Sequence, residues 1–227
     1  MKSPIIVALD MSPENALELA RKLNPDECKV KVGSQLFTSS GPEIIKKLTN
    51  LGFDVFLDLK YHDIPNTVGK VVEASIELGI WMINVHSLGG KEMLRAASET
   101  VEQASVKPLL LGVTILTSLD DKALNSVGLG LPVADQVLLL AELCQNEGLD
   151  GVVCSPSELP ALRNQLNEDF LLVTPGVRSS GKAKDDQKRV STAALAIKNG
   201  ANFVVIGREI TMDIDPRRKI RQILETV

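Results

Sequence analysis

The chain has few aromatic residues and no excess of positive charge. Phe, Trp and Tyr make up 3% of its 227 residues, and 25 Lys and Arg stand against 29 Asp and Glu, which gives a formal charge of −4. A nucleic-acid partner requires a basic face, and stacking on single strands requires aromatic side chains. The composition therefore argues against a nucleic-acid partner and, by its charge, against a membrane-surface partner.

Cysteine is also scarce. Cys28, Cys144 and Cys154 are an odd set without Cys-x-x-Cys spacing, which suggests neither a disulfide framework nor a thiolate metal site. Free thiols fit a reducing compartment. The chain has no run of about 20 apolar residues for a membrane span, and the apolar run before Asp10 is too short for a signal peptide. We therefore expect a cytoplasmic protein.

What the chain does contain is a regular series of short apolar segments, rich in Val, Ile and Leu, with amphipathic segments between them. Such segments are typical of parallel strands covered by helices. Eight units in this length predict an α/β fold, a (β/α)8 TIM barrel formed by one domain over residues 1–227. A doubly wound sheet is the alternative, but it would not usually need eight units. The predicted strands lie at 4–9, 28–33, 53–59, 81–86, 108–116, 149–154, 170–174 and 202–207.

Helix boundary signals agree with this series. Ser12-Pro13-Glu14 combines a cap, a first-turn proline and an acid, Asp215-Pro216 repeats the pattern before a last helix at about 216–226, and Gly41-Pro42-Glu43 opens the second helix. Glycines at the predicted ends of helices are expected to adopt left-handed conformations. These are Gly52, Gly79, Gly148 and Gly200.

The run Asp58-Leu59-Lys60-Tyr61-His62-Asp63 ends the third predicted strand. Because side chains alternate along a strand, Asp58 and Lys60 should share a face with Phe56, while the neighbouring apolar residues face the helices. Burying both charges is costly unless the site has further partners or a use for them. A structural ion pair is the simpler interpretation of the run taken alone.

Further charged residues follow other strands, where the chemistry of such a barrel is found. Asp10 ends the first strand and Lys31 the second, so they should meet Asp58 and Lys60 at one mouth. Lys29 shares the face of Lys31 lower down and should extend toward the barrel bottom.

Two histidines and two residues beyond the third strand are weaker candidates. His86 ends the fourth strand, where a histidine is more often packed and hydrogen-bonded than catalytic, and His62 is treated as incidental. Asp63 and Thr67 follow the third strand, and Asp63 could equally cap the next helix.

The last two loops suggest a phosphate site. Thr174-Pro175-Gly176-Val177-Arg178 follows the seventh strand and Ile206-Gly207-Arg208 the eighth. In these barrels the corresponding loops often bind phosphate, and two arginines can grip a dianion. The polar stretch 179–189 is by default a solvated loop, but a lid fits equally well. Gly128-Leu129-Gly130 is a weak signal that indicates a turn.

Together these motifs resemble the bacterial orotidine 5′-monophosphate decarboxylases over nearly the whole chain. The segment from Asp58 to Thr67 is highly specific, and the shorter motifs fall in the right order on the right strands. The motifs are Val7-Ala8-Leu9-Asp10, Lys31-Val32-Gly33, Asp58-Leu59-Lys60-Tyr61-His62-Asp63-Ile64-Pro65-Asn66-Thr67, Leu116-Thr117-Ser118, Thr174-Pro175-Gly176-Val177-Arg178, Asp186-Gln187 and Ile206-Gly207-Arg208.

The resemblance implies decarboxylation of orotidine 5′-monophosphate to uridine 5′-monophosphate in pyrimidine biosynthesis, without a metal or organic cofactor. Lys60 would donate a proton to C6, Asp58 would lie against the departing carboxylate, and Lys31 and Asp63 would complete the charge network. Ligand contacts would come from Asp10 and Lys31 to the ribose, Thr117 to the pyrimidine, and Gln187, Arg178, Gly207 and Arg208 to the phosphate and its lid.

The resemblance also implies a homodimer in which Asp63 and Thr67 reach the neighbouring subunit's site. Glu209 departs from the family, which usually has proline after Gly-Arg. One alternative is a Mg²⁺-dependent keto-sugar-phosphate decarboxylase or hexulose-phosphate synthase, although these usually have Glu at the position of Lys31. Another is a non-catalytic phosphonucleotide-binding barrel, which would gain nothing from the charge cluster.

Overall fold

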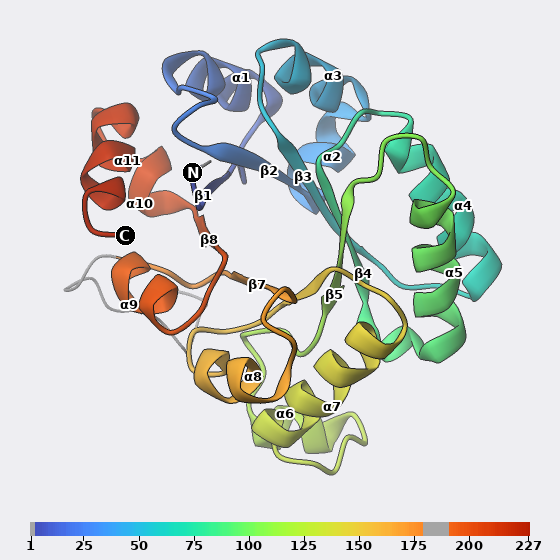
Figure 1. Ribbon diagram of the computed structural model, residues 1–227. Coiled ribbons are helices and arrows are strands. Elements are labelled where there is room, and N and C mark those ends of the chain that lie inside the picture. Colours follow the sequence, from blue (N-terminus) through green and yellow to red (C-terminus); the bar gives the residue numbers. More distant parts are fainter. Residues whose placement is uncertain (1–2, 179–190) are drawn as a thin grey trace.

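The computed structural model describes residues 3–178 and 191–227, and its strands form a closed parallel barrel in chain order, β1 to β8 (Figure 1). β8 pairs with β1 and closes the ring. The predicted TIM barrel and its strand positions are therefore confirmed. The strands are β1 (Ile5–Ala8), β2 (Lys29–Gly33), β3 (Val55–Tyr61), β4 (Met82–His86), β5 (Leu109–Val113), β6 (Gly151–Val153), β7 (Leu171–Thr174) and β8 (Phe203–Ile206).

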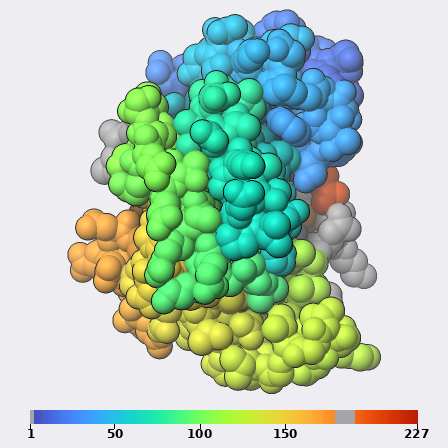
Figure 2. Space-filling view, turned by 90° about the vertical axis from the view of Figure 1, so that its right-hand side faces the viewer, coloured from blue at the N-terminus to red at the C-terminus, as the bar shows by residue number. Residues whose placement is uncertain are grey.

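Helices surround the barrel, and α4 and α5 lie side by side on the face shown in Figure 2. Across residues 3–178 and 191–227, no helix is both long enough and apolar enough to cross a membrane. The helices are α1 (Pro13–Lys22), α2 (Ser34–Ser40), α3 (Glu43–Asn50), α4 (Pro65–Ile76), η1 (Ser87–Gly89), α5 (Lys91–Glu102), α6 (Asp121–Ser126), α7 (Val133–Asn146), α8 (Leu159–Gln165), α9 (Ala193–Lys198), α10 (Arg208–Thr211) and α11 (Pro216–Leu224).

Strand alternation divides the core into two layers. Val55 and Leu57 of β3 point outward and join the large apolar cluster between strands and helices. Phe56 points inward and packs in a smaller cluster that fills the barrel. That inner cluster contains Ile6, Ala8, Phe56, Met82, Leu111, Val173 and Val205.

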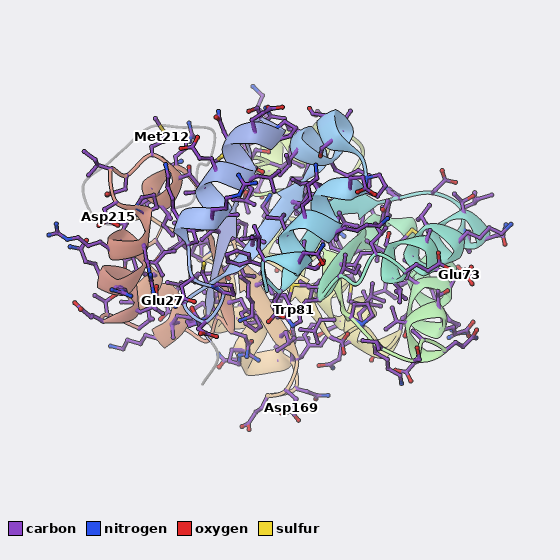
Figure 3. The ribbon with its side chains drawn as sticks, turned by 90° about the horizontal axis from the view of Figure 1, so that it is seen from above. Glu27, Glu73, Trp81, Asp169, Met212 and Asp215 are labelled. Carbon is purple, nitrogen blue, oxygen red and sulfur yellow. The ribbon has the colours of Figure 1, made fainter. Side chains whose placement is uncertain are left out.

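The two ends of the barrel differ in what they carry. Trp81 lies directly before β4 and Asp169 two residues before β7, so they mark the N-terminal end, and they lie toward one side of the view in Figure 3. Met212 follows α10, after β8, and lies toward the opposite side. The loops after the strands therefore open at the Met212 side.

The predicted helix starts are largely confirmed. The Ser12 side chain caps α1 with Pro13 in its first turn, and Asp215 caps α11 in the same way. The glycines expected to be left-handed have positive φ, from 75° at Gly79 to 103° at Gly200.

Two local expectations need correction. Between β2 and β3 the chain forms two helices, α2 and α3, where the sequence predicts one. The start of α2 is missed because its N-cap residue, Gly33, has no capping side chain that would mark it in the sequence. Asp63 does not cap α4: Ile64 is the N-cap residue, and the Asp63 carboxylate instead accepts from the Ile64 N–H at 2.7 Å.

Candidate active site

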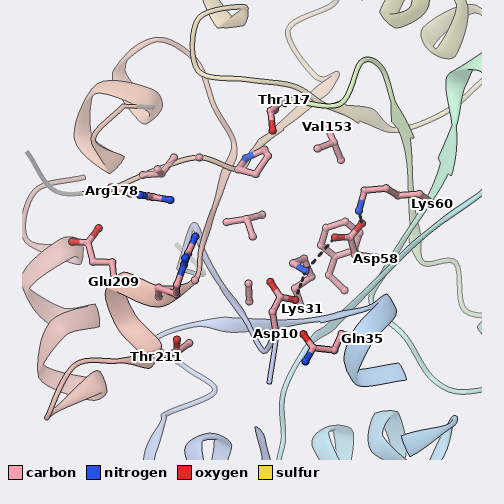
Figure 4. A pocket seen from close by; sticks show the side chains of 18 residues that line it. Asp10, Lys31, Gln35, Asp58, Lys60, Thr117, Val153, Arg178, Glu209 and Thr211 are labelled. Carbon is pink, nitrogen blue, oxygen red and sulfur yellow. Dashed lines mark hydrogen bonds and ion pairs between the residues drawn. The ribbon is translucent and has the colours of Figure 1, made fainter. Parts of the chain in front are cut away.

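A cavity of about 620 Å³ opens among the C-terminal ends of the strands (Figure 4). Its wall includes most of the residues that the sequence singles out. These are Asp10, Lys31, Asp58, Lys60, Thr117, Arg178, Gly207 and Arg208. They come from six strands or the loops that follow them, which explains why residues so far apart in sequence meet here.

Four of these side chains form a chain of alternating charge. The Lys31 ammonium lies 3.1 Å from the Asp10 carboxylate and 3.2 Å from Asp58 Oδ2. Asp58 Oδ1 in turn accepts from Lys60 Nζ at 2.6 Å. The central pair is nearly buried, since the Lys31 and Asp58 side chains are 9% and 12% exposed, whereas Lys60 and Asp10 are 37% and 55% exposed. The two ends of the chain can therefore meet a ligand.

The charge chain keeps Asp58 ionised. Burial alone would raise the pKa of its carboxyl, but Lys31 and Lys60 outweigh this and hold the pKa below its ordinary value. Hydrogen bonds from Lys60 and Asn84 act in the same direction. Asp58 is thus an anion at neutral pH, with its charge already in place before a ligand arrives.

Lys31 is stabilised as a cation by the same arrangement. Its burial would lower its pKa, but the charges of Asp58 and Asp10, with their hydrogen bonds, raise it above the ordinary value. A buried ammonium between two carboxylates is a fixed charge. Such a network can stabilise charge that develops in a reaction without reorganising at that moment.

The loops after β7 and β8 form the other side of the cavity. Gly176 has a φ of 78°, which favours glycine, and the next residues are held by a bridge between Val177 and Ser191. The Arg178 N–H donates to the Ser191 carbonyl at 2.8 Å. Arg178 and Arg208 both line the cavity, and Figure 4 shows Arg178 on the side away from Asp58 and Lys60.

Several candidates lie elsewhere. Asp63 is exposed and Thr67 half-buried, and neither lines this cavity. Gln187 and the stretch 179–189, which the sequence predicts to be a solvated loop or a lid, lie outside the described residues.

The two histidines form a contact that the sequence does not suggest. Their rings stack with centroids 5.3 Å apart. The pKa of His86 is lowered from its ordinary value, mainly by burial and further by the charges of His62 and Lys60. The Nδ1 atom of His86 accepts a hydrogen bond from the Leu88 N–H at 3.4 Å. Neither histidine lines the cavity, so His86 is placed as a packed, hydrogen-bonded residue.

Sequence reasoning missed other parts of the site. Gln35, Glu209 and Thr211 line the cavity, and Asn84 is fully buried beneath Asp58, to which its side-chain amide donates at 2.7 Å. The signal for Asn84 was a lone amide within an apolar strand. Glu209 was noted only as a departure, and it pairs with Lys219 of α11 at 2.9 Å.

Within the part of the chain that the structure describes, no three His, Cys, Asp or Glu side chains are grouped so that they could hold a metal ion. Cys28, Cys144 and Cys154 are free and buried. Burial raises the pKa of each of these three thiols to about 12.

A closed (β/α)8 barrel with a preorganised charge chain at its C-terminal mouth belongs to the class of barrel enzymes. The chain is matched over residues 3–223 by the model of the Orotidine 5'-phosphate decarboxylase / HUMPS family, and it belongs to that family.

Individual relatives agree with this assignment. The chain is 51% identical over 223 residues to an orotidine 5'-phosphate decarboxylase of Nitrosococcus oceani, covering 98% of this chain and 96% of the relative. It is 49% identical to that of Dichelobacter nodosus, with 99% of each chain covered. The crystal structure of the Lactobacillus acidophilus enzyme superposes with a TM-score of 0.88 at 40% identity, covering 99% of this chain and 98% of that one.

Proposed function

We propose that this chain decarboxylates orotidine 5′-monophosphate to uridine 5′-monophosphate in pyrimidine biosynthesis, with Lys60 as the proton donor. The chain is a carboxy-lyase by its family and by relatives of about the same length. The observation that carries the assignment of roles is the alternating chain from Asp10 through Lys31 and Asp58 to Lys60. We place the reaction in the cytoplasm.

The chemistry explains why such a charge chain is useful. Loss of CO₂ from an sp² carbon leaves a carbanion that has no conjugated group to receive the electron pair. In the proposed mechanism the C6–CO₂ bond breaks, its electrons remain on C6, and the Lys60 ammonium stabilises this charge and then donates a proton to it. Asp58 lies against the departing carboxylate. This proposal requires neither a metal nor an organic cofactor.

The other cavity residues would hold the nucleotide. Asp10 and Lys31 are proposed to bind the ribose hydroxyls and Thr117 the pyrimidine. The phosphate would lie between the loops after β7 and β8, with Gln187 added from beyond the described residues. Contacts to this remote group can be used to close the site and exclude water. The proposed phosphate ligands are Arg178, Gln187, Gly207 and Arg208.

A homodimer would complete each site. Asp63 and Thr67 lie outside the cavity of their own chain, and the Asp63 side chain is exposed at the end of β3. We propose that both reach the cavity of the partner subunit, where Asp63 would extend the charge chain beside Lys60. This accounts for two residues of the family motif that their own subunit does not use.

Turnover by metal-free protein tests the proposed reaction. Purified protein is treated with EDTA and mixed with orotidine 5′-monophosphate, and the change in absorbance is followed. Turnover without metal supports the proposal. Activity seen only with Mg²⁺ and a keto-sugar phosphate would move the assignment to the Mg²⁺-dependent relatives, and nucleotide binding without turnover in either assay would indicate a non-catalytic barrel.

Mixing two inactive variants tests the shared site. Lys60→Ala and Asp63→Ala should each abolish turnover and leave dimers intact. In a 1:1 mixture allowed to exchange subunits, a mixed dimer has one site with both residues, so roughly a quarter of the wild-type activity should return. If the mixture stays inactive although exchange is demonstrated by mass, Asp63 does not act across the interface.

A further inference from the structure

The pairing of β3 with β4 is irregular at the charge chain. Leu57 pairs with Ile83 and Tyr61 with Val85, so the three residues from Asp58 to Lys60 stand opposite Asn84 alone. Extra residues of this kind bulge a strand and redirect its side chains, and such bulges occur next to active sites. The irregularity here falls on the two residues that carry the Asp58–Lys60 ion pair.

The backbone of Lys60 is strained. Its φ is 51°, and within the described ranges 3–178 and 191–227 no other residue except glycine has a positive φ. Side chains with a Cβ rarely adopt this region, and such a conformation persists only where the surroundings impose it. Some contact must therefore hold Lys60 in place.

The Asn84 amide makes that contact. Its Oδ1 accepts from the Lys60 backbone N–H at 2.8 Å, and its Nδ2 donates to Asp58 Oδ1 at 2.7 Å. The same Asp58 oxygen accepts from Lys60 Nζ at 2.6 Å. One side chain, 0% exposed, thus bonds to both partners of the ion pair, through the backbone of one and the carboxylate of the other.

The chemistry of the two contacts is selective for an amide. An N–H group needs an acceptor and a carboxylate needs a donor, and a carboxamide offers one of each at its two ends. A carboxylate at position 84 would meet Asp58 with like charge, and an apolar side chain would leave both groups unsatisfied in a buried place. Asparagine therefore suits both tasks at once.

We propose that Asn84 is a positioning residue that holds the Lys60 backbone in its left-handed conformation and fixes Asp58 for the reaction. The inference rests on the proposed function, because it assigns Asn84 a part in the work of Lys60. Asn84 does not line the cavity, so it acts through Lys60 and Asp58 and not on the nucleotide.

Three variants test this role. Asn84→Asp keeps the shape but puts a carboxylate against Asp58, and Asn84→Leu keeps approximate size without either hydrogen bond. Both should lower kcat for orotidine 5′-monophosphate by ~10²-fold, the effect of displacing a catalytic group by about 1 Å. Affinity for uridine 5′-monophosphate should stay within about threefold of wild type. Lys29→Met, at the other end of the barrel, is the control for a buried substitution without catalytic effect.

The pH profile separates positioning from packing. When the carboxyl group introduced by Asn84→Asp is protonated, it offers one O–H donor to Asp58 and one acceptor to the Lys60 N–H. Its kcat relative to wild type should therefore recover as pH falls, by up to about tenfold per pH unit. Asn84→Leu should show no recovery. The ionisable groups nearby are Asp58 and Lys60 on β3, Lys31 on β2 and His86 on β4, and division by the wild-type profile removes their titration.

The outcomes are distinct. The inference is overturned if Asn84→Asp folds and has a kcat within threefold of wild type. It is also overturned if the loss of kcat in Asn84→Asp, relative to wild type, is the same at every pH. If Asn84→Leu does not fold, as judged by circular dichroism, the pH profile of Asn84→Asp alone carries the test. Wild-type protein that fails to convert orotidine 5′-monophosphate overturns the proposed function instead.

Discussion

Lys29 and Lys31 are two residues apart on β2 and point to the same side of the strand, yet their surroundings differ completely. Both are buried, at 4% and 7% exposed. The Lys29 ammonium donates to the Ser3 carbonyl at 2.8 Å and lies 5.1 Å from the Trp81 ring centroid. Lys31 lies between the carboxylates of Asp10 and Asp58.

The contrast lies in the groups that surround each buried ammonium. At the N-terminal end, the Ser3 carbonyl and the faces of Trp81 and Phe203 contact the Lys29 ammonium. At the C-terminal end, Lys31 belongs to a series of charges that leads to an exposed ammonium. Residue type and burial are therefore shared, and the position along the strand decides the role.

The largest expected effect comes from the open end of the charge chain. Lys60→Ala should reduce kcat by about 10³-fold or more, because it removes the proposed proton donor and the cation that would face C6. The fold should remain, as shown by an unchanged circular dichroism spectrum and by retained binding of uridine 5′-monophosphate. Near-normal turnover by this variant would refute the proposed mechanism.

The two lysines of β2 provide a matched pair. Lys31→Met should lower kcat/KM by ~10²-fold, since Asp58 loses one of its cations and Asp10 its partner. Lys29→Met should leave kcat within about twofold of wild type, but should lower the free energy of unfolding by about 1–3 kcal/mol because a buried carbonyl loses its donor.

Steady-state kinetics and urea unfolding on both variants provide the comparison. Equal losses of activity at the two positions would mean that position along the strand does not separate structure from catalysis. The β2 lysines would then need a common explanation, such as the rigidity of the whole barrel.

The loss of stability in acid should depend on Asp58 at the C-terminal end of the barrel. The pKa of Asp58 is lowered from its ordinary value of 3.8, so its stabilising contribution is complete above that value and is lost as pH falls through the lower folded pKa. Asp58 lies at the other end of the barrel from the Ser3 carbonyl and the two aromatic rings that contact Lys29. Unfolding midpoints from pH 7 to 2 should show an acid limb that Asp58→Asn reduces and Lys29→Met leaves in place.

At alkaline pH, the stability contributed by the charge chain changes with pH in the opposite direction. The pKa of Lys31 is raised above 10.5, so its contribution is complete below that value and is lost only as pH rises through the higher folded pKa. Asp58 and Lys31 should therefore both be ionised from about pH 5 to 9. An Asp58-dependent loss of stability within that range would contradict the assigned directions.

Much of this site could be predicted from the sequence because strand alternation is simple. Asp58 and Lys60 do meet, and Lys31 does lie between carboxylates, as two-residue periodicity requires. The bulge could not be predicted, since the same periodicity assumes a regular strand. The φ of Lys60 is linked to Asn84, 24 residues later, so no local pattern encodes it.

Other gaps have different causes. α2 has no cap signal at Gly33, so its start is invisible in the sequence. The roles proposed for Asp63 and Thr67 depend on a second chain. Glu209 was noticed as a departure from proline, but only the fold reveals that Lys219 of α11 reaches it.

Lys219 extends the comparison to a third lysine, at the edge of the mouth. Its ammonium pairs with Glu209 at 2.9 Å, and Glu209 lines the cavity with Arg178. Lys219→Met removes this cation, so the Glu209 carboxylate can compete with phosphate for the arginines. KM should rise by about threefold to tenfold with kcat nearly unchanged, which is the signature of lost uniform binding.

The matched control separates charge from packing. Glu209→Gln combined with Lys219→Met removes the competing anion together with its partner, so KM should return to within about twofold of wild type. If the double variant binds as weakly as Lys219→Met alone, Lys219 acts by packing α11 against α10 and not by neutralising Glu209. A fall in kcat at constant KM would instead place Lys219 with Lys31, among the lysines proposed to serve the chemical step. The position of a lysine between the N-terminal end and the mouth of the barrel would then not predict its role.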